Sequence, residues 1–589
     1  MPILNVKLEK PLFLAALAIL LCALRWVFIA NGFDYGWDYE TGYRVYQGGI
    51  YGKDFYTALG PLSYEVIGQV FRWFGPRWVL IYPLYYGCWI LSWYGVFLLF
   101  KRLTPRIEIL SLVLMIVAPL SIPHLVALHL YNCLSYCLSI WCGVFCFNYL
   151  FSGRCRYLVP AAVLASLSLF TKQNLGLGVA ILVFLLIIIE GCLRKNIKVI
   201  DFIKPMLTFG FVFVFLNAIL FGWFSRNISF KELYTLMFID AASAKGNFFN
   251  MLKTAVPRIS FGQSNQRDVR WLIQHIGELF SYGLILGFNL ICYRKFWSKS
   301  PQNSGEKKSF PTQNDVIGCF VGFVFFLVIP LIIPDVVFYW RQKYFWLNED
   351  YRLNSIIFAS CFWYVIIGLV FYLFVLWKRQ QLFVKDSLAL LFLLIFSLGM
   401  NVWICASRFA YFFLNTPLFL SLFFITGLIL GVWSRKQFLT GVFLMWFLGL
   451  FFYPTHSVSQ MDTIPGYSVE GLFFSKSERD FVTFYTEKVK PWVKGKRTLW
   501  LVHGGPHSLS EAIPVRNVSN LYFDQYNSRI EESLVKDWMQ HPPEMIVLDW
   551  FVTPDTSVWL RGDLFRNWLS SQYLEVTKVA GKKILKLKN

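Results

Sequence analysis

The sequence predicts a polytopic α-helical membrane protein with about thirteen transmembrane helices and a small C-terminal α/β domain outside the cytoplasm. Of its 589 residues, 57% are hydrophobic and 15% are charged, whereas soluble globular proteins average about 25% charged residues. Apolar runs of roughly twenty residues recur along most of the chain, and each is long enough to cross a bilayer as a helix. Lys and Arg gather in alternate segments between these runs, as in chains that cross a membrane repeatedly.

The predicted transmembrane spans follow the apolar runs in order. They lie at 12–30, 78–100, 107–122, 130–151, 157–171, 175–192, 204–222, 273–292, 315–334, 354–377, 387–405, 412–433 and 438–453. The first is interpreted as a membrane helix and not as a signal peptide, because no small-residue cleavage site follows it and further spans do. The chain therefore divides into a membrane domain, 1–453, and a soluble domain, 454–589.

The basic residues set the predicted orientation. With a cytoplasmic N-terminus, every inside segment carries Lys or Arg, at 7–10, 101–106, 154–156, 194–204, 294–308, 378–385 and 435–436. An odd number of spans then places the C-terminal domain outside, together with long loops at 31–77, 223–272 and 335–353. The formal net charge of +21 is attributed to topology, and nucleic acid is not an expected partner.

The C-terminal region alternates strand-like and helix-like segments, which predicts a small α/β domain. Short β-type runs occur at 498–504 and 545–551, and helical patterns at 475–493, 528–540 and 563–572. All twelve Cys lie before residue 410, so no disulfide framework is expected in this domain. Four of them, Cys133, Cys137, Cys142 and Cys146, fall on one span, where helix packing is favoured over a metal site.

The first external loop is unusually polar for so apolar a chain. It reads GWDYETGYRVYQGGIYGKDFYTALGPLSYEV over 36–66 and contains the acids Asp38, Glu40 and Asp54 within its first nineteen positions. In an extended segment, Asp38 and Glu40 would face the same side, because they are two residues apart. These acids are either solvated loop charges or part of a cavity shaped by the surrounding Gly, Trp and Tyr residues. The return of the loop to the membrane through Gly60-Pro61-Leu62 favours the cavity.

Cations are predicted on the same side of the membrane. Lys172 lies with Gln173 on a short external turn, where it either snorkels to the interface or binds a phosphate. Arg408 lies between the eleventh and twelfth spans, and its planar fork also suits a phosphate. The loop 223–272 adds Lys231, Lys245, Lys253, Arg258, Arg267 and Arg270. Acids facing cations suit a substrate with a phosphate leaving group and an acceptor hydroxyl that is deprotonated.

The first loop resembles the first external loop of bacterial GT-C superfamily glycosyltransferases, polytopic enzymes that take sugars from polyprenyl-phosphate carriers. The residues that carry the resemblance are Asp38-x-Glu40, Tyr43, Gly48-Gly49, Asp54-Phe55 and Gly60-Pro61-Leu62. The Thr171-Lys172-Gln173 turn is similar to a Lys-Gln turn of many members, and Arg408 followed by Pro417 is similar to a late Arg…Pro pattern. Members include protein mannosyltransferases, aminoarabinose transferases and oligosaccharyltransferase catalytic subunits. Here Tyr39 separates the two acids that are adjacent in many members.

The resemblance implies an inverting transfer of a hexosyl or pentosyl group to an extracytoplasmic lipid, glycan or protein acceptor at the bacterial plasma membrane. Asp38 is the first candidate for the catalytic base and Glu40 the second. The donor phosphate would be bound by Lys172, Gln173 and Arg408. Further substrate contacts are expected from Asp54, Tyr43, Arg258 and Arg270. No cofactor is expected, although a divalent metal ion shared by Asp38 and Glu40 stays open.

Two other functional classes are compatible with a polytopic chain. A secondary transporter or flippase of an anionic lipid-linked substrate would place ionisable residues near the middle of the membrane, often within inverted repeats. In this sequence the ionisable clusters lie at the external ends of the spans, and no internal repeat is visible. A ligase or polymerase of lipid-linked glycans would use related chemistry but typically relies on a large loop late in the sequence. The sequence therefore favours the transferase.

Overall fold

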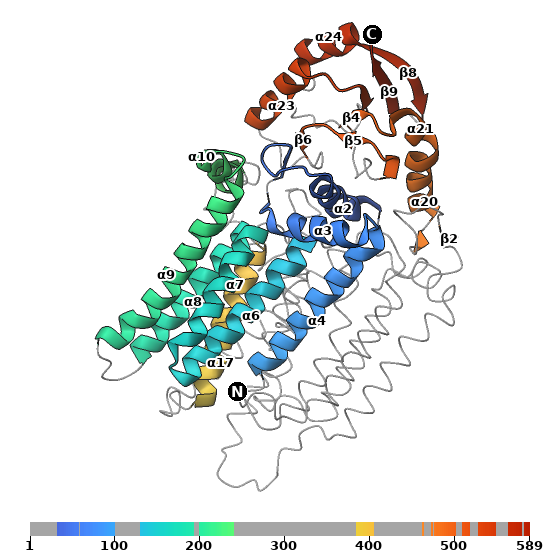
Figure 1. Cartoon of the computed structure of the whole chain (residues 1–589). Coiled ribbons are helices and arrows are strands. Elements are labelled where there is room, and N and C mark those ends of the chain that lie inside the picture. The colour runs from blue at the N-terminus through green and yellow to red at the C-terminus, as the bar shows by residue number, and fades with distance from the viewer. Residues whose placement is uncertain are drawn as a thin grey trace, which may run out of the picture.

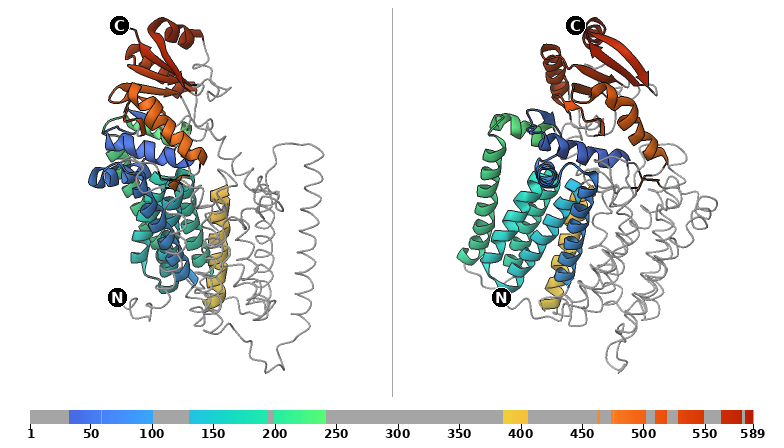
Figure 2. Two further views of the ribbon diagram at one scale, coloured as in Figure 1. Left: turned by 90° about the vertical axis from the view of Figure 1, so that its right-hand side faces the viewer. Right: turned by 45° about the vertical axis from the view of Figure 1, so that its right-hand side comes forward.

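The computed structural model describes residues 32–57, 59–100, 130–193, 199–240, 385–405, 462–463, 473–474, 476–501, 509–518, 528–548, 563–579 and 582–588. Within this part of the chain, long helices run side by side as a bundle (Figure 1). The first loop, a short helix and the C-terminal sheet all gather at one end of that bundle. Figure 2 shows the same layering from two further directions.

Six predicted spans fall within the described residues, and each is a helix. They are α4 (Ile81–Phe100, preceded by the 3-10 turn η1, Trp78–Leu80), α6 (Leu130–Ser152), α7 (Leu158–Thr171, preceded by η3, Cys155–Tyr157), α8 (Gln173–Leu193), α9 (Val199–Phe224) and α17 (Lys385–Cys405). Their bounds agree with the predicted spans to within a few residues. The other seven predicted spans lie outside the described residues. Among the described helices, α6, α8 and α9 are long and apolar enough to cross a membrane.

Helix α6 contacts α4, α7 and α8 and forms the middle of the described bundle. Its four cysteines are buried free thiols, in keeping with the predicted packing role. A Cβ on Gly143 would collide with the ring of Phe396, so the small residue lets α17 approach α6 closely. No group of three His, Cys, Asp or Glu residues that could hold a metal ion occurs in the described part of the chain.

The first loop is folded mainly as two packed helices. These are α2 (Gly32–Tyr46) and α3 (Leu62–Phe74), joined through the two-residue strand β1 (Phe55–Tyr56). A Cβ on Gly42 would meet the side chain of Ile67, and one on Gly68 would meet Val45, so two glycines allow the helices to lie close together. After α9, Ser229 caps the short helix α10 (Phe230–Tyr234) by accepting the Glu232 amide. The π-helix η4 (Thr235–Asp240) follows.

The described C-terminal residues form a mixed five-stranded sheet with helices. The helical segments are α20 (Lys476–Thr483), η8 (Phe484–Val489), α21 (Lys490–Val493), α23 (Ser528–Gln540) and α24 (Asp563–Gln572). The sheet has the order β5 (Ile513–Pro514), β4 (Arg497–Leu501), β7 (Met545–Leu548), β9 (Lys582–Leu587), β8 (Tyr573–Val579). The β5–β4 and β4–β7 pairs are parallel, whereas the β7–β9 and β9–β8 pairs are antiparallel. All four residues of β7 are buried, as expected for a central strand. A separate two-stranded sheet pairs β2 (Asp462–Thr463) with β3 (Phe473–Phe474).

The first loop and the C-terminal domain share a hydrophobic core. Strand β1 pairs in parallel with β6 (Asn517–Val518). Tyr56 of β1 and Leu236 of η4 belong to the same buried cluster as Trp538, Phe565 and other side chains of the C-terminal domain. Because these apolar surfaces exclude water together, the loop and the domain stabilise each other's position.

Candidate functional site

Asp38 is held where three helices meet. It lies on α2 and is fully buried. Its Oδ2 accepts a 2.6 Å hydrogen bond from the backbone amide of Leu130 and another from the hydroxyl of Tyr85. Leu130 is the first residue of α6, so its amide is one of those that a helix start leaves without an intrahelical partner. A carboxylate at that position is also stabilised by the helix dipole.

Tyr39, which separates the two acids in sequence, anchors the helix that carries them. It is fully buried, and its ring lies 5.0 Å from that of Phe71 and 4.9 Å from that of Trp78 between centroids. Its hydroxyl donates to the carbonyl of Pro76. These contacts attach α2 to α3 and to the start of α4, and so orient the neighbouring Asp38.

Glu40 points to a different set of partners. Its Oε1 lies 3.3 Å from Nε of Arg44, one helical turn further along α2, and both side chains are buried. The Nη1 of Arg44 donates a 3.1 Å hydrogen bond to the carbonyl of Val515 in the C-terminal domain. A buried charge pair therefore connects the first loop to that domain.

The expectation that Asp38 and Glu40 face the same side is wrong. It assumes an extended segment, but the residues lie on an α-helix, where two positions are about 200° apart around the axis. Asp38 contacts the start of α6, and Glu40 contacts Arg44. The divalent ion that the sequence left open for these two acids stays a prediction.

Lys172 is buried and not exposed at an interface, so the snorkelling alternative is wrong. It follows α7 in an extended conformation, and 2% of its surface is exposed. Its Nζ donates a 2.7 Å hydrogen bond to Oδ1 of Asn132 and lies 5.8 Å from the ring centre of Tyr131. Nδ2 of Asn132 is buried and has no hydrogen-bond partner among the described residues.

The predicted acid and cation thus meet at one turn of α6. Asp38 contacts Leu130, and Lys172 contacts the side chains of the next two residues, Tyr131 and Asn132. Their contact points on α6 are within three consecutive residues, although 134 positions separate the acid from the cation in sequence. This turn of α6 thus contacts both a proton acceptor and a positive charge, and both are buried, where electrostatic interactions are strong.

Gln173 and Asn174 tie the same turn to another helix. Gln173 is buried and begins α8. Nδ2 of Asn174 donates a 3.0 Å hydrogen bond to the carbonyl of Trp403, near the end of α17. Arg408 follows α17 in sequence but lies outside the described residues, as do Arg258 and Arg270. Their predicted substrate contacts stay predictions.

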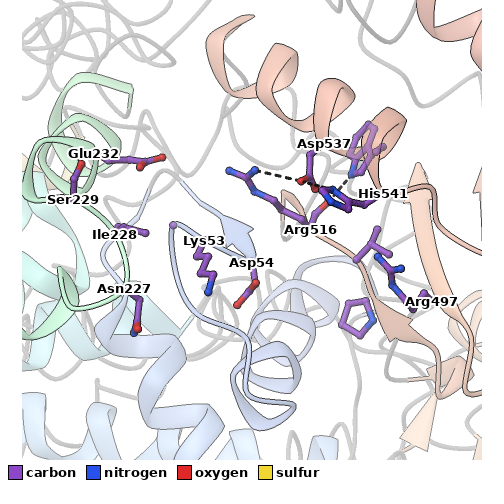
Figure 3. A pocket seen from close by; sticks show the side chains of 14 residues that line it. Lys53, Asp54, Asn227, Ile228, Ser229, Glu232, Arg497, Arg516, Asp537 and His541 are labelled. Carbon is purple, nitrogen blue, oxygen red and sulfur yellow. Dashed lines mark hydrogen bonds and ion pairs between the residues drawn. The ribbon is translucent and has the colours of Figure 1, made fainter.

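Tyr43 and Asp54 occupy distinct positions in the loop. Tyr43 is buried on α2 and accepts a 3.1 Å hydrogen bond from Nε2 of Gln47. Burial, together with the negative charge of Glu40, raises the pKa of Tyr43 to about 12, so its phenol stays protonated at neutral pH. Asp54 accepts a 2.9 Å hydrogen bond from the Ile50 amide and lines a cavity against the C-terminal domain (Figure 3).

Sequence reasoning missed Tyr85, Asn132 and Arg44. For Arg44 a signal was present, because Glu40 and Arg44 are four residues apart with the acid first, the favourable order on a helix. That spacing argues for a helical loop. Tyr85 and Asn132 lie within apolar runs, where no local pattern distinguishes a polar side chain that serves a site from one that serves packing.

The comparisons with known proteins concern the whole chain. No protein-family model and no curated protein sequence matches it. Among solved structures, it is similar to the archaeal oligosaccharyltransferase AglB from Archaeoglobus fulgidus, in complex with an inhibitory peptide and a dolichol-phosphate. That match has 13% identity, a TM-score of 0.47, and covers 99% of this chain and 75% of the other.

A second similar structure is ArnT from Cupriavidus metallidurans in the apo state, with 12% identity and a TM-score of 0.38, covering 98% of this chain and 97% of the other.

Proposed function

We propose that the chain is a membrane glycosyltransferase that moves a sugar from a polyprenyl-phosphate carrier to an acceptor outside the cytoplasm. The observation that supports this most directly is the meeting of Asp38 and Lys172 at the first turn of α6. The transfer needs a base for the acceptor hydroxyl and a positive charge for the departing phosphate, and these two side chains supply them.

The proposed reaction proceeds with inversion. A carboxylate oxygen of Asp38 takes the proton of the acceptor hydroxyl, whose oxygen forms a bond to the anomeric carbon. The bond between that carbon and the phosphate oxygen breaks, and its electron pair leaves with the polyprenyl phosphate. The ammonium of Lys172 stabilises the charge that develops on that phosphate, and Nδ2 of Asn132 is a further donor beside it. The hydrogen bonds from Tyr85 and Leu130 orient the carboxylate and stabilise its ionised form.

The position of these groups favours a transferase over a transporter. Leu130 is the first residue of α6, Lys172 directly follows the last residue of α7, and Tyr85 lies in the second turn of α4. Asp38 therefore contacts the first residue of α6 and Lys172 lies at the end of α7, not halfway along these helices, where transporters hold their substrates. The end in question is the one that carries the first loop and the C-terminal sheet (Figure 1).

The test compares Asp38→Asn with Glu40→Gln. Mass spectrometry of envelope glycolipids from cells with and without the gene identifies the sugar that is transferred, and the same readout then scores each variant. Loss of a general base typically costs 10²- to 10⁴-fold in rate, so we expect roughly that loss for Asp38→Asn. Near-normal transfer by Asp38→Asn, in protein that inserts and purifies normally, would rule out Asp38 as the base.

Lys172→Met tests the phosphate role separately. Methionine keeps much of the apolar length of the side chain but removes the charge. We expect the rate of transfer to fall. The variant should also need a higher concentration of the polyprenyl-phosphate donor to reach half of its maximal rate, because the cation stabilises the phosphate that is bound and released. An unchanged donor dependence would contradict this role for Lys172.

A further inference from the structure

The cavity that Asp54 lines lies at the junction of the first loop, the start of α10 and the C-terminal domain (Figure 3). Its volume is about 660 Å³, within the range of roughly 300–1,000 Å³ typical of ligand sites. Lys53 and Asp54 form one wall, and residues around Ser229 and Glu232 form another. The third wall comes from Arg497, Arg516 and the end of α23. The three walls come from segments far apart in the sequence.

The fixed charges of this cavity balance. Three cations, Lys53, Arg497 and Arg516, face three acids, Asp54, Glu232 and Asp537. One pairing is internal to the wall, because Asp537 lies 3.8 Å from Arg516 and 3.5 Å from His541. A ligand with several charges of one sign gains little from such a lining, since each favourable contact is matched by an unfavourable one.

The lining is instead rich in groups that bind hydroxyls. Carboxylates accept hydrogen bonds, guanidinium and ammonium groups donate them, and Asn227 and Ser229 add groups of both kinds. Neighbouring sugar hydroxyls both donate and accept, so they can satisfy such alternating partners at once. The aromatic residue at this wall, Trp538, is 1% exposed, and its Nε1 donates to the Arg516 carbonyl at 2.6 Å. It therefore belongs to the core of the domain, and the ligand-facing surface is mainly polar.

The residues that line the cavity also contact α2, the helix that carries the proposed base Asp38. Val515 lines it, and the carbonyl of Val515 accepts the hydrogen bond from Arg44. Arg44 pairs with Glu40 on α2, the helix that also carries Asp38. Arg516, the next wall residue, contacts Tyr56 through its guanidinium. An occupant of the cavity thus touches the same backbone that holds the first loop in place.

We propose that this cavity binds a neutral oligosaccharide, away from the reacting hydroxyl. Binding itself is independent of the proposed function. The use of that oligosaccharide as part of the acceptor rests on the proposed function. A bound glycan would fix the first loop against the C-terminal domain and so hold Asp38 in position while transfer occurs.

The test measures binding in full-length protein that carries Asp38→Asn, so that transfer does not consume the ligand. The probes are maltoheptaose, chitotetraose and mannotetraose, with tetragalacturonate as an anionic counterpart, and native mass spectrometry and calorimetry report binding. The lining variants are Glu232→Gln and Arg497→Gln, and Lys578→Gln, an exposed residue of β8 outside the lining, is the matched control. Hydrogen exchange of the α2 amides reports whether binding increases the protection of this helix.

We expect at least one neutral probe to bind, and each lining variant to weaken its binding about tenfold or more, as for the loss of a hydrogen bond to a charged group. Lys578→Gln should bind as the parent does. Failure of all neutral probes to bind, preferential binding of the anionic probe, or equal binding by the lining variants would overturn the proposal. A failure of the proposed function would look different, because Asp38→Asn cells would then retain transfer whatever the cavity binds.

Discussion

Removing the charge of Arg44 should loosen the first loop far more than removing an exposed charge of the same geometry. Glu40 and Arg44 form an i, i+4 pair with 1% and 3% of their side chains exposed. Breaking a buried pair by removing one partner costs about 3–5 kcal/mol, because the remaining charge stays buried without its counterion. Arg44→Met does this while keeping much of the apolar stem, and it also removes the donor to Val515.

Hydrogen exchange with mass spectrometry reads this loss locally, over the amides of Gly32–Tyr46. A loss of about 3–5 kcal/mol corresponds to exchange faster by roughly 10² to several times 10³ for amides that exchange through opening of this loop. The control is Lys536→Met. Glu532 and Lys536 also form an i, i+4 pair with the acid first, but 39% and 61% of their side chains are exposed. That exposed pair is worth about 0.3–0.5 kcal/mol, so less than a threefold change is expected in α23.

A double variant separates the lost charge pair from the lost contact with the C-terminal domain. Glu40→Gln with Arg44→Met removes both charges, so no uncompensated charge remains. The free energy of opening of α2 should then recover to within about 1–3 kcal/mol of the parent. The remaining difference corresponds to the lost hydrogen bond to Val515. If Arg44→Met changed exchange in α2 by less than tenfold, the buried pair would not be what holds this helix, and the inferred link to the C-terminal domain would fail.

Two further predictions concern the same loop. A Cβ on Gly60 would collide with the carbonyl oxygen of Phe170, so Gly60→Ala should reduce transfer and thermal stability together. Gly87→Ala, where the Cβ meets nothing within 4 Å, should be neutral or stabilising by up to about 1 kcal/mol in its helix, and equal behaviour of the two variants in a thermal-shift assay would refute the packing argument. Burial and the nearby Glu40 raise the pKa of Tyr43 from 10.0 to about 12, so the folded state retains the phenolic proton more strongly than the unfolded chain does. Its contribution to stability is complete below pH 10 and is lost as the pH rises through 12; Tyr43→Phe should lack this part of the alkaline destabilisation in chemical denaturation, and an identical decline in both proteins would contradict the assignment.

Much of the architecture follows from local properties of the chain. The predicted span 130–151 agrees with α6, and 175–192 agrees with α8, because a run of apolar residues long enough to cross a bilayer forms a helix to satisfy its own backbone. The sequence also predicts the strands at 497–501 and 545–548, because short β-type runs between polar segments form buried strands.

The conformation of the first loop does not follow from its local sequence pattern, for an equally physical reason. Gly, Tyr and acidic residues in short succession are typical of irregular external loops. In an extended segment of that kind, Asp38 and Glu40 would lie on the same side. Tertiary contacts outweigh those weak local preferences: Tyr39 is enclosed by Phe71 and Trp78, and its burial favours the helix that brings it there.

The sequence by itself determined which groups were available for chemistry, namely a first-loop acid and a cation on the Lys172 turn, and that apolar helices would separate them. Only the tertiary structure decided that both groups meet at the first turn of α6, that Glu40 is paired with Arg44 instead of lying beside Asp38, and that Val515 joins the loop to the C-terminal domain. The physical reason is range. Hydrophobic periodicity reports on neighbours within a few turns, whereas contacts across 40 to 471 residues depend on how whole helices and strands pack.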